Sequence, residues 1–347
     1  MDSKAELPPI TPKTSPWNWA RKNLFNTWYN SILTVICLWV IYQLGGGFLH
    51  WAIAWADWQV IGVNWRLFLV GRYPPQLYWR VGMATGIIAG AAAFSFGATR
   101  WRSRWVKWIP LAWILAFPVI LWLIGGGFGL REVQTQLWNG LLLTLVTAIV
   151  SIVLSFPAGV LLALGRQSSL PVLRWLCILY IEIIRGLPLI GILFMAQVML
   201  PLFLPVEMRL DRVMRAIAGL SLFSSAYMAE NVRGGLQSVP QGQIEAAKAL
   251  GLATPWVIWL IVLPQALRAV IPAIVGQFIG LFKNTSLLAL VGLVELTGMA
   301  RSILAQPEFI GDYAEVYIFV GLIYWIFCYG MSRASRQLEQ KLARGKT

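Results

Sequence analysis

The chain has 347 residues, of which 58% are hydrophobic and only 12% are charged. Roughly a quarter of the residues in a soluble domain are charged, so this composition excludes most classes of soluble protein. The net charge of +14 does not indicate nucleic-acid binding, because the basic residues lie mainly at the ends of apolar runs, as in 100–108 and 333–346. That placement is typical of the cytoplasmic loops of membrane proteins.

The first 27 residues are polar and contain four prolines, which predicts a cytoplasmic N-terminal tail over 1–27. Apolar runs of about 20 residues, the length needed to cross a bilayer, follow along the chain. They predict an all-α membrane protein with about eight transmembrane helices. The predicted spans are 28–45, 81–99, 109–128, 138–164, 172–203, 213–233, 257–282 and 312–334.

Basic residues at the helix ends favour an orientation with both termini in the cytoplasm, including a C-terminal tail over 335–347. Residues 28–130 are predicted to form a three-helix membrane extension with a Trp-rich periplasmic loop, WAIAWADWQVIGVNW. The sequence GGGF occurs at 45–48 and at 125–128, and glycine in both places is expected to end a helix at the external side.

The segment 238–264 interrupts the apolar pattern and is predicted to fold as helix, sharp turn, helix. Ser238 and Gln241 have the spacing of a capping box for the first helix. Gly251 stands where that helix needs a left-handed residue, and Thr254-Pro255 offers an N-cap hydroxyl followed by proline.

The same segment reads EAA, three residues, glycine, nine residues, isoleucine, one residue, then Leu-Pro. It resembles the EAA loop of ATP-binding-cassette (ABC) importer permeases, which couples a membrane domain to a cytoplasmic ATPase. The resemblance implies that the coupling residues are Glu245, Ala246, Ala247, Lys248, Gly251, Ile261, Leu263 and Pro264. An ordinary polar connector is the alternative that short motifs leave open.

Segments at 137–146, 181–194, 224–252, 263–287 and 294–300 resemble, in order, the permeases of the polar amino acid uptake family. This implies a type I ABC importer permease core of five helices over 137–334, with the EAA loop at 238–264. The three spans in front resemble those of permeases for general, neutral or polar L-amino acids. One departure is Asn284, where the family usually has aspartate, and it leans the cargo away from Lys, Arg and His.

Charged residues inside apolar spans are costly and are therefore candidates for the substrate pathway. Glu182 and Arg185 lie three residues apart and could pair, and Glu230 and Arg233 repeat the spacing. Each pair either fixes helix packing or lines a chamber for a zwitterion. A further candidate group, at the external end of the seventh span, is Lys283, Asn284, Thr285 and Ser286.

Three isolated cysteines and one histidine provide neither a disulfide framework nor a zinc site. The C-terminal RGKT lacks the first glycine of a phosphate-binding loop, since Gln340 stands there, so no enzyme activity and no cofactor are expected in this chain.

ATP and Mg are expected on partner ATPase subunits. The family resemblance implies two such subunits, a second homologous permease or a second copy of this chain, and a periplasmic amino-acid-binding protein. The predicted location is the bacterial inner membrane. An amino acid transporter driven by an ion gradient is the alternative.

Overall fold

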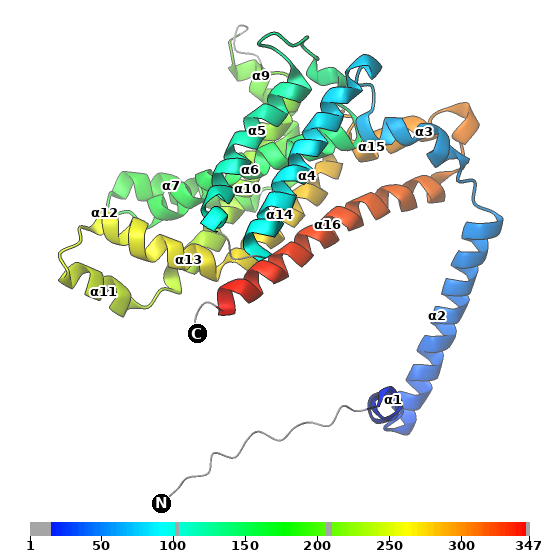
Figure 1. Cartoon of the computed structure of the whole chain (residues 1–347), viewed down its shortest axis with the longest axis horizontal. Coiled ribbons are helices and arrows are strands. Elements are labelled where there is room, and N and C mark those ends of the chain that lie inside the picture. Colours follow the sequence, from blue (N-terminus) through cyan, green and yellow to red (C-terminus); the bar gives the residue numbers. More distant parts are fainter. Residues whose placement is uncertain (1–14, 101–103, 206–209, 345–347) are drawn as a thin grey trace, which may run out of the picture. The chain divides into compact units, whose positions relative to one another are not determined.

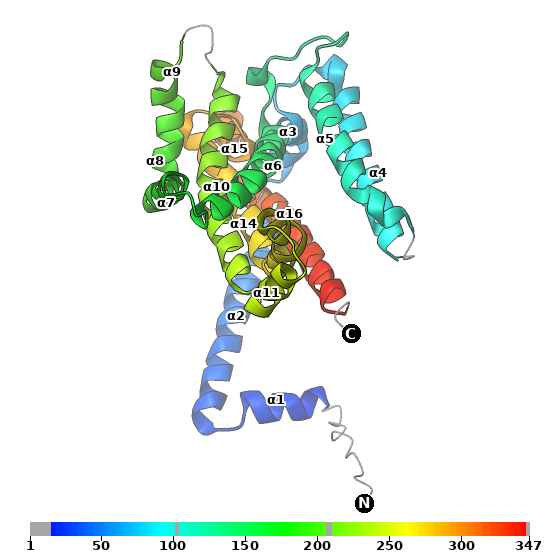
Figure 2. The same cartoon turned by 90° about the vertical axis from the view of Figure 1, so that its left-hand side faces the viewer.

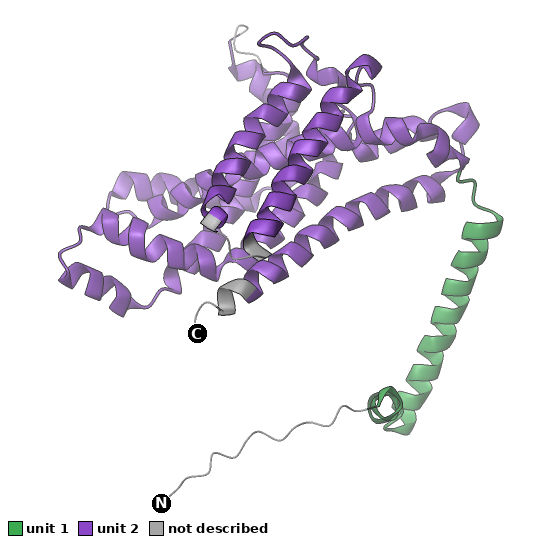
Figure 3. Cartoon of the chain, in the orientation of Figure 1, with its two compact units in different colours: residues 1–58 green, residues 59–347 purple. Residues whose placement is uncertain are grey.

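The computed structural model describes residues 15–100, 104–205 and 210–344, so part of each predicted tail lies outside the described residues. It divides into two compact units, Met1–Trp58 and Gln59–Thr347 (Figure 3). The predicted boundary between the N-terminal extension, 28–130, and the core, 137–334, stays a prediction. The first unit contains α1 (Pro16–Leu24) and α2 (Trp28–Ala54).

Helix α2 corrects one sequence prediction. The helix continues through Gly45, Gly46 and Gly47 and ends at Ala54, nine residues beyond the predicted end of the span. Each glycine in a helix costs about 1 kcal/mol relative to alanine in water. In a bilayer, however, breaking the helix would leave backbone groups without hydrogen-bond partners, which costs several kcal/mol per group. The second GGGF behaves as predicted, because α5 ends at Gly125 and Gly126 adopts a positive φ of 83°.

The second unit is a helical bundle (Figure 1). Its first half consists of α3 (Gln59–Val70), η1 (Pro75–Leu77), α4 (Tyr78–Arg100), η2 (Arg104–Trp108), α5 (Ile109–Gly125), η3 (Thr135–Leu137), α6 (Gly140–Arg166), α7 (Pro171–Gly186), α8 (Leu189–Phe194), η4 (Met195–Met199) and α9 (Leu200–Phe203). Its second half consists of α10 (Arg212–Gln237), α11 (Gln241–Ala249), α12 (Thr254–Trp256), η6 (Val257–Val262), α13 (Leu263–Ala269), α14 (Ile271–Asn284), η7 (Thr285–Val291), α15 (Leu296–Leu304), η8 (Pro307–Phe309) and α16 (Tyr313–Arg344).

Six helical segments of the described residues are long and apolar enough to cross a membrane. A seventh span is made by α7 with α8, η4 and α9, which bend by 106° at Leu187-Pro188. The predicted count of eight also includes α10, which has 26 residues but carries more polar side chains. Pro264 lies in the first turn of α13, where the helix continues unbroken from α12 through η6, so this proline does not interrupt the predicted seventh span. That span is interrupted at Val270, between α13 and α14, and Pro272 lies in the first turn of α14.

Helices α6 and α10 form the centre of the second unit and run in the same direction. Thr135, just before α6, donates to Asp211 at the start of α10, and Arg166 at the end of α6 pairs with Glu230 near the end of α10. Small residues allow close approach: a Cβ on Gly159 would lie 2.5 Å from the Cβ of Met228. The end that carries α11 is called the loop end below, and the other is called the opposite end.

Candidate functional site

The turn after α11 is closed by backbone hydrogen bonds of the predicted kind. The N–H of Gly251 donates to the carbonyl of Lys248 at 2.9 Å, and the N–H of Leu252 donates to that of Ala247 at 3.2 Å. This pair of bonds is a Schellman motif, which needs a left-handed residue after the helix. Gly251 has φ +80°, so the prediction for Gly251 is confirmed.

The two predicted caps beside this turn are wrong. Pro240, not Ser238, precedes α11, and the hydroxyl of Ser238 donates instead to the carbonyl of Gly235 within α10. Ala253 precedes α12, and Thr254 is already its first residue. In both places proline fixes the backbone where a helix starts, so a side-chain cap is not required.

Helix α11 presents most of the predicted coupling residues on the surface. Glu245, Ala246, Lys248 and Gly251 are exposed, whereas Ala247 is buried. Leu250 is 83% exposed, which is unusual for a large apolar side chain beside a polar helix. Sequence analysis missed Leu250, although its place directly before the glycine of the turn could have indicated it.

The return limb of the loop anchors it in the bundle. Leu263 is 5% exposed, Ile261 is half-buried, and Pro264 is exposed at the start of α13. Leu263 and Ile261 join Ala247 in one hydrophobic core with residues of α6, α7 and α10, among them Ile181 and Val232. A displacement of α11 must therefore move side chains that pack against three spanning segments, because cores are close-packed.

A network of charged residues borders this core at the loop end. Glu230 pairs with three guanidinium groups: it accepts hydrogen bonds from Arg166 at 2.8 Å and from Arg233 at 3.0 Å, and it forms an ion pair with Arg185 at 3.4 Å. Arg166 also pairs with Glu182 at 3.2 Å. Three arginines therefore face two glutamates, and the network links α6, α7 and α10.

The network corrects the predicted local pairing on α7. The ion pair of Arg185 is with Glu230 on α10, and that of Glu182 is with Arg166 on α6. The pairing of Glu230 with Arg233 is confirmed. Arg166 was missed, because an arginine at the end of a predicted span indicates orientation first. Glu182 is the most exposed member, with 56% of its side chain accessible.

The group around Lys283 lies at the opposite end of the second unit. Lys283 is exposed and Asn284 and Ser286 are half-buried. Thr285 is buried, and its hydroxyl donates to the carbonyl of Phe282 at 2.7 Å. The hydroxyl of Ser286 donates to the carbonyl of Lys283 at 2.8 Å. The four residues therefore do not meet the Glu230 network, and both hydroxyls have backbone partners.

Glu295 is a buried carboxylate directly before α15. It caps α15, accepting from the N–H groups of Thr297 and Gly298 at 2.9 Å, and from the hydroxyl of Tyr324 at 3.1 Å. It lies between two membrane-spanning segments, 271–291 and 313–340. Burial raises the pKa of Glu295 to about 7, although the hydrogen bonds that it accepts oppose the shift.

Because the pKa of Glu295 is higher in the folded chain than the ordinary value of 4.5, the folded state binds more protons between pH 4.5 and about 7. The stability of the protein is therefore expected to fall as pH rises through this window, by up to about 3 kcal/mol. Thermal unfolding in detergent from pH 4 to 8 measures this, and Glu295→Gln should flatten the profile. Parallel profiles for the two proteins would contradict the assignment.

Among the described residues, no group of three or more His, Cys, Asp or Glu side chains could hold a metal ion. The candidate site therefore consists of the exposed helix α11, the apolar core that it packs against and the network of ion pairs beside that core.

Comparison with known proteins agrees with this geometry. Residues 155–344 match the family described as "Binding-protein-dependent transport system inner membrane component". The chain belongs to this family of ABC importer permeases. The predicted fold class is thereby confirmed, and the ion-gradient alternative is left without support.

The permease is similar to two proteins over nearly its whole length. It is 42% identical over 348 residues to the inner membrane amino-acid ABC transporter permease protein YhdY of Escherichia coli (strain K12), covering 95% of this chain and 94% of the relative. It is 35% identical over 405 residues to the glutamate/glutamine/aspartate/asparagine transport system permease protein BztC of Rhodobacter capsulatus, covering 94% and 93%.

One solved structure is also similar to the permease. The crystal structure of an amino acid ABC transporter with histidines matches it with a TM-score of 0.52 and 30% identity. The match covers 58% of this chain and 92% of the other. The remainder of the permease thus lies outside the part shared with that transporter.

Proposed function

We propose that the permease works in an ATP-driven importer of L-amino acids of neutral, polar or broad range. Both relatives that cover nearly the whole chain are named as amino acid permeases, which supports this cargo class. Two cytoplasmic ATPase subunits bind ATP and Mg, a second permease or a second copy completes the membrane domain, and a periplasmic binding protein delivers the substrate. The loop end and both termini face the cytoplasm.

The observation that carries the proposal is the geometry of the coupling loop. Glu245, Ala246, Lys248 and Leu250 point away from the bundle, and Ala247 and Leu263 pack inside it. An ATPase that binds the exposed face of α11 can therefore displace the helices that pack against its buried face. Closure of the ATPase pair on ATP opens the pathway outward, and hydrolysis resets it, as expected for a link between two-state elements.

The charge network supplies the polar groups of the substrate pathway. Glu182 offers a half-exposed carboxylate for the ammonium group of an amino acid, and Arg185, with 35% of its side chain accessible, offers a guanidinium for its carboxylate. Glu230 holds Arg185 in place from α10. Asn284 removes one carboxylate that could attract a cationic side chain, in keeping with neutral or polar cargo.

The test is co-purification of the permease from its native membrane, followed by ATP hydrolysis with and without the native binding protein and a panel of amino acids. We expect an ATPase and a second permease to co-purify, with hydrolysis raised by particular amino acids. A chain that purifies alone, and whose transport follows an ion gradient, would overturn the proposal.

A further inference from the structure

Helices α4 and α5 form a hairpin that shares a hydrophobic cluster with α6 at one end of the unit. At the opposite end of the unit, Ala84 and Ile124 are buried together with Leu142 and Val146 of α6. The hydroxyl of Tyr73 fixes this end by donating to the carbonyl of Ile124 at 2.9 Å. The hairpin therefore has a firm attachment where α4 begins and α5 ends.

Toward the turn between α4 and α5 the hairpin separates from the bundle (Figure 2). Burial along α5 follows this divergence: Leu123 and Ile124 are each 3% exposed, whereas Trp113 is 40% exposed and Leu115 is 58% exposed. The backbones of the hairpin and α6 thus diverge from the attachment toward the loop end, and the space where they begin to diverge is called the wedge below.

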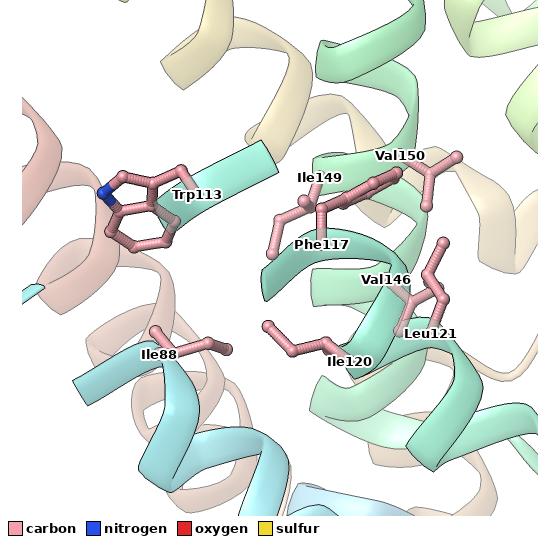
Figure 4. Close-up of a pocket in the computed structure, with 8 residues that line it drawn as sticks. All are labelled: Ile88, Trp113, Phe117, Ile120, Leu121, Val146, Ile149 and Val150. Carbon is pink, nitrogen blue, oxygen red and sulfur yellow. The ribbon is translucent and has the colours of Figure 1, made fainter. Parts of the chain in front are cut away.

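The narrow part of this wedge is a partly open apolar cavity of about 100 Å³. Side chains from three helices converge on it (Figure 4). Its lining residues are Ile88 from α4, Trp113, Phe117, Ile120 and Leu121 from α5, and Val146, Ile149 and Val150 from α6. All three helices are long and apolar enough to span the membrane, so the cavity lies at hydrocarbon depth.

We propose that this wedge binds one acyl chain of a phospholipid from the leaflet at the loop end. Water is disfavoured there, because the lining offers only carbon atoms apart from the indole N–H of Trp113, which donates to Ser95 at 3.0 Å. A partner helix is too wide for a cavity of about 100 Å³, since helices are about 10 Å across. The end of a single acyl chain is narrow enough to enter it.

The entrance suits the head group of the same lipid. Lys107 is exposed in η2, six residues before Trp113 in the chain, and its ammonium lies 5.8 Å from the ring centroid of Trp108. Lysine and tryptophan at a helix end are typical of the membrane interface, where a lysine can meet a lipid phosphate. The lipid then supplies the contacts that the hairpin lacks toward the loop end.

Native mass spectrometry of the purified permease, titrated with phosphatidylcholine or phosphatidylglycerol of one chain length, tests the proposal. Ile149→Trp fills the cavity, and the matched control Leu154→Trp places the same ring on an exposed part of α6, about 140° round the helix. We expect about a tenfold loss of affinity for the tightest lipid with Ile149→Trp, since excluding two methylene groups has that effect.

Leu154→Trp is expected to bind lipid like the unmodified chain, and Lys107→Gln to weaken both lipids. If Lys107→Gln weakens only the binding of phosphatidylglycerol, Lys107 recognises the net negative charge of the head group, and this result also supports the proposal. Equal lipid binding by all variants would overturn it. So would loss of a co-purified second permease in Ile149→Trp with lipid binding unchanged, because the wedge would then hold a protein helix. The lipid site depends on the proposed function only through the orientation, which decides the leaflet. The binding assay needs neither ATP nor transport, so a negative result would refute the lipid site without refuting the importer function.

Discussion

Replacing Gly251 by aspartate is expected to abolish amino acid uptake while leaving the permease inserted in the membrane. Gly251 has φ +80°, a conformation that costs most other residues roughly 1–2 kcal/mol and costs aspartate and asparagine less. A negative charge at this place also opposes the dipole at the C-terminal end of α11, by up to about 1 kcal/mol. Both effects act on the Schellman turn and on the exposed coupling face, and uptake of labelled amino acid by cells measures their consequence.

The matched control for this variant is Gly251→Asn. A Cβ at position 251 would meet nothing within 4 Å, so neither replacement clashes with the bundle. Asparagine tolerates the left-handed conformation better than most residues and carries no charge. We therefore expect Gly251→Asn to retain much of the uptake. Normal uptake by Gly251→Asp, at equal membrane abundance, would refute the role of this turn in coupling.

Replacing Glu230 by glutamine is expected to destabilise the permease by about 2 kcal/mol. The change leaves Arg166, Arg185 and Arg233 around a neutral amide, and removing one partner of a buried ion pair usually costs several kcal/mol. The network is partly accessible, so solvent screening lowers this figure. Thermal unfolding of the purified protein in detergent provides the measurement.

Glu182→Gln applies the same change to the exposed side of the network. Only Arg166 loses a partner, and exposed pairs contribute about 1 kcal/mol or less, so unfolding should change little. If Glu182 meets the substrate ammonium group, uptake falls while ATP hydrolysis without substrate persists. Unchanged uptake with Glu182→Gln would remove Glu182 from the substrate pathway. A large drop in stability would instead assign Glu182 a structural role.

The coupling loop was predictable because its signals are local. A helix that ends in a Schellman turn needs a left-handed residue within one turn of its end, and Gly251 provides it whatever the rest of the chain does. The caps at Ser238 and Thr254 failed because prolines two or fewer residues away already start the helices. When a capping residue and a proline both indicate a helix start within two residues, the sequence does not say which of them sets it, and the backbone of the structure does.

The partners of the charged residues were not predictable in the same way. Spacing on α7 suggested that Glu182 pairs with Arg185, but α6 and α10 approach closely enough for Arg166 and Glu230 to take both partners. The burial of Glu295 depends likewise on Tyr324, which lies 29 residues away in the chain. Such contacts are set by which helices pack together, and periodicity does not contain that information.

The sequence by itself determined that this protein is an all-α membrane protein with a sharp turn at Gly251, because hydrophobic length and the turn glycine act within single segments. Its resemblance to importer permeases indicated the family. Only the tertiary structure decided that Ala247 faces the core, that Glu230 joins three arginines, and that α4 and α5 leave an apolar wedge beside α6. These features come from contacts between helices that are far apart in the chain. Such contacts depend on how side chains of different helices fit together, which the pattern within one helix does not show.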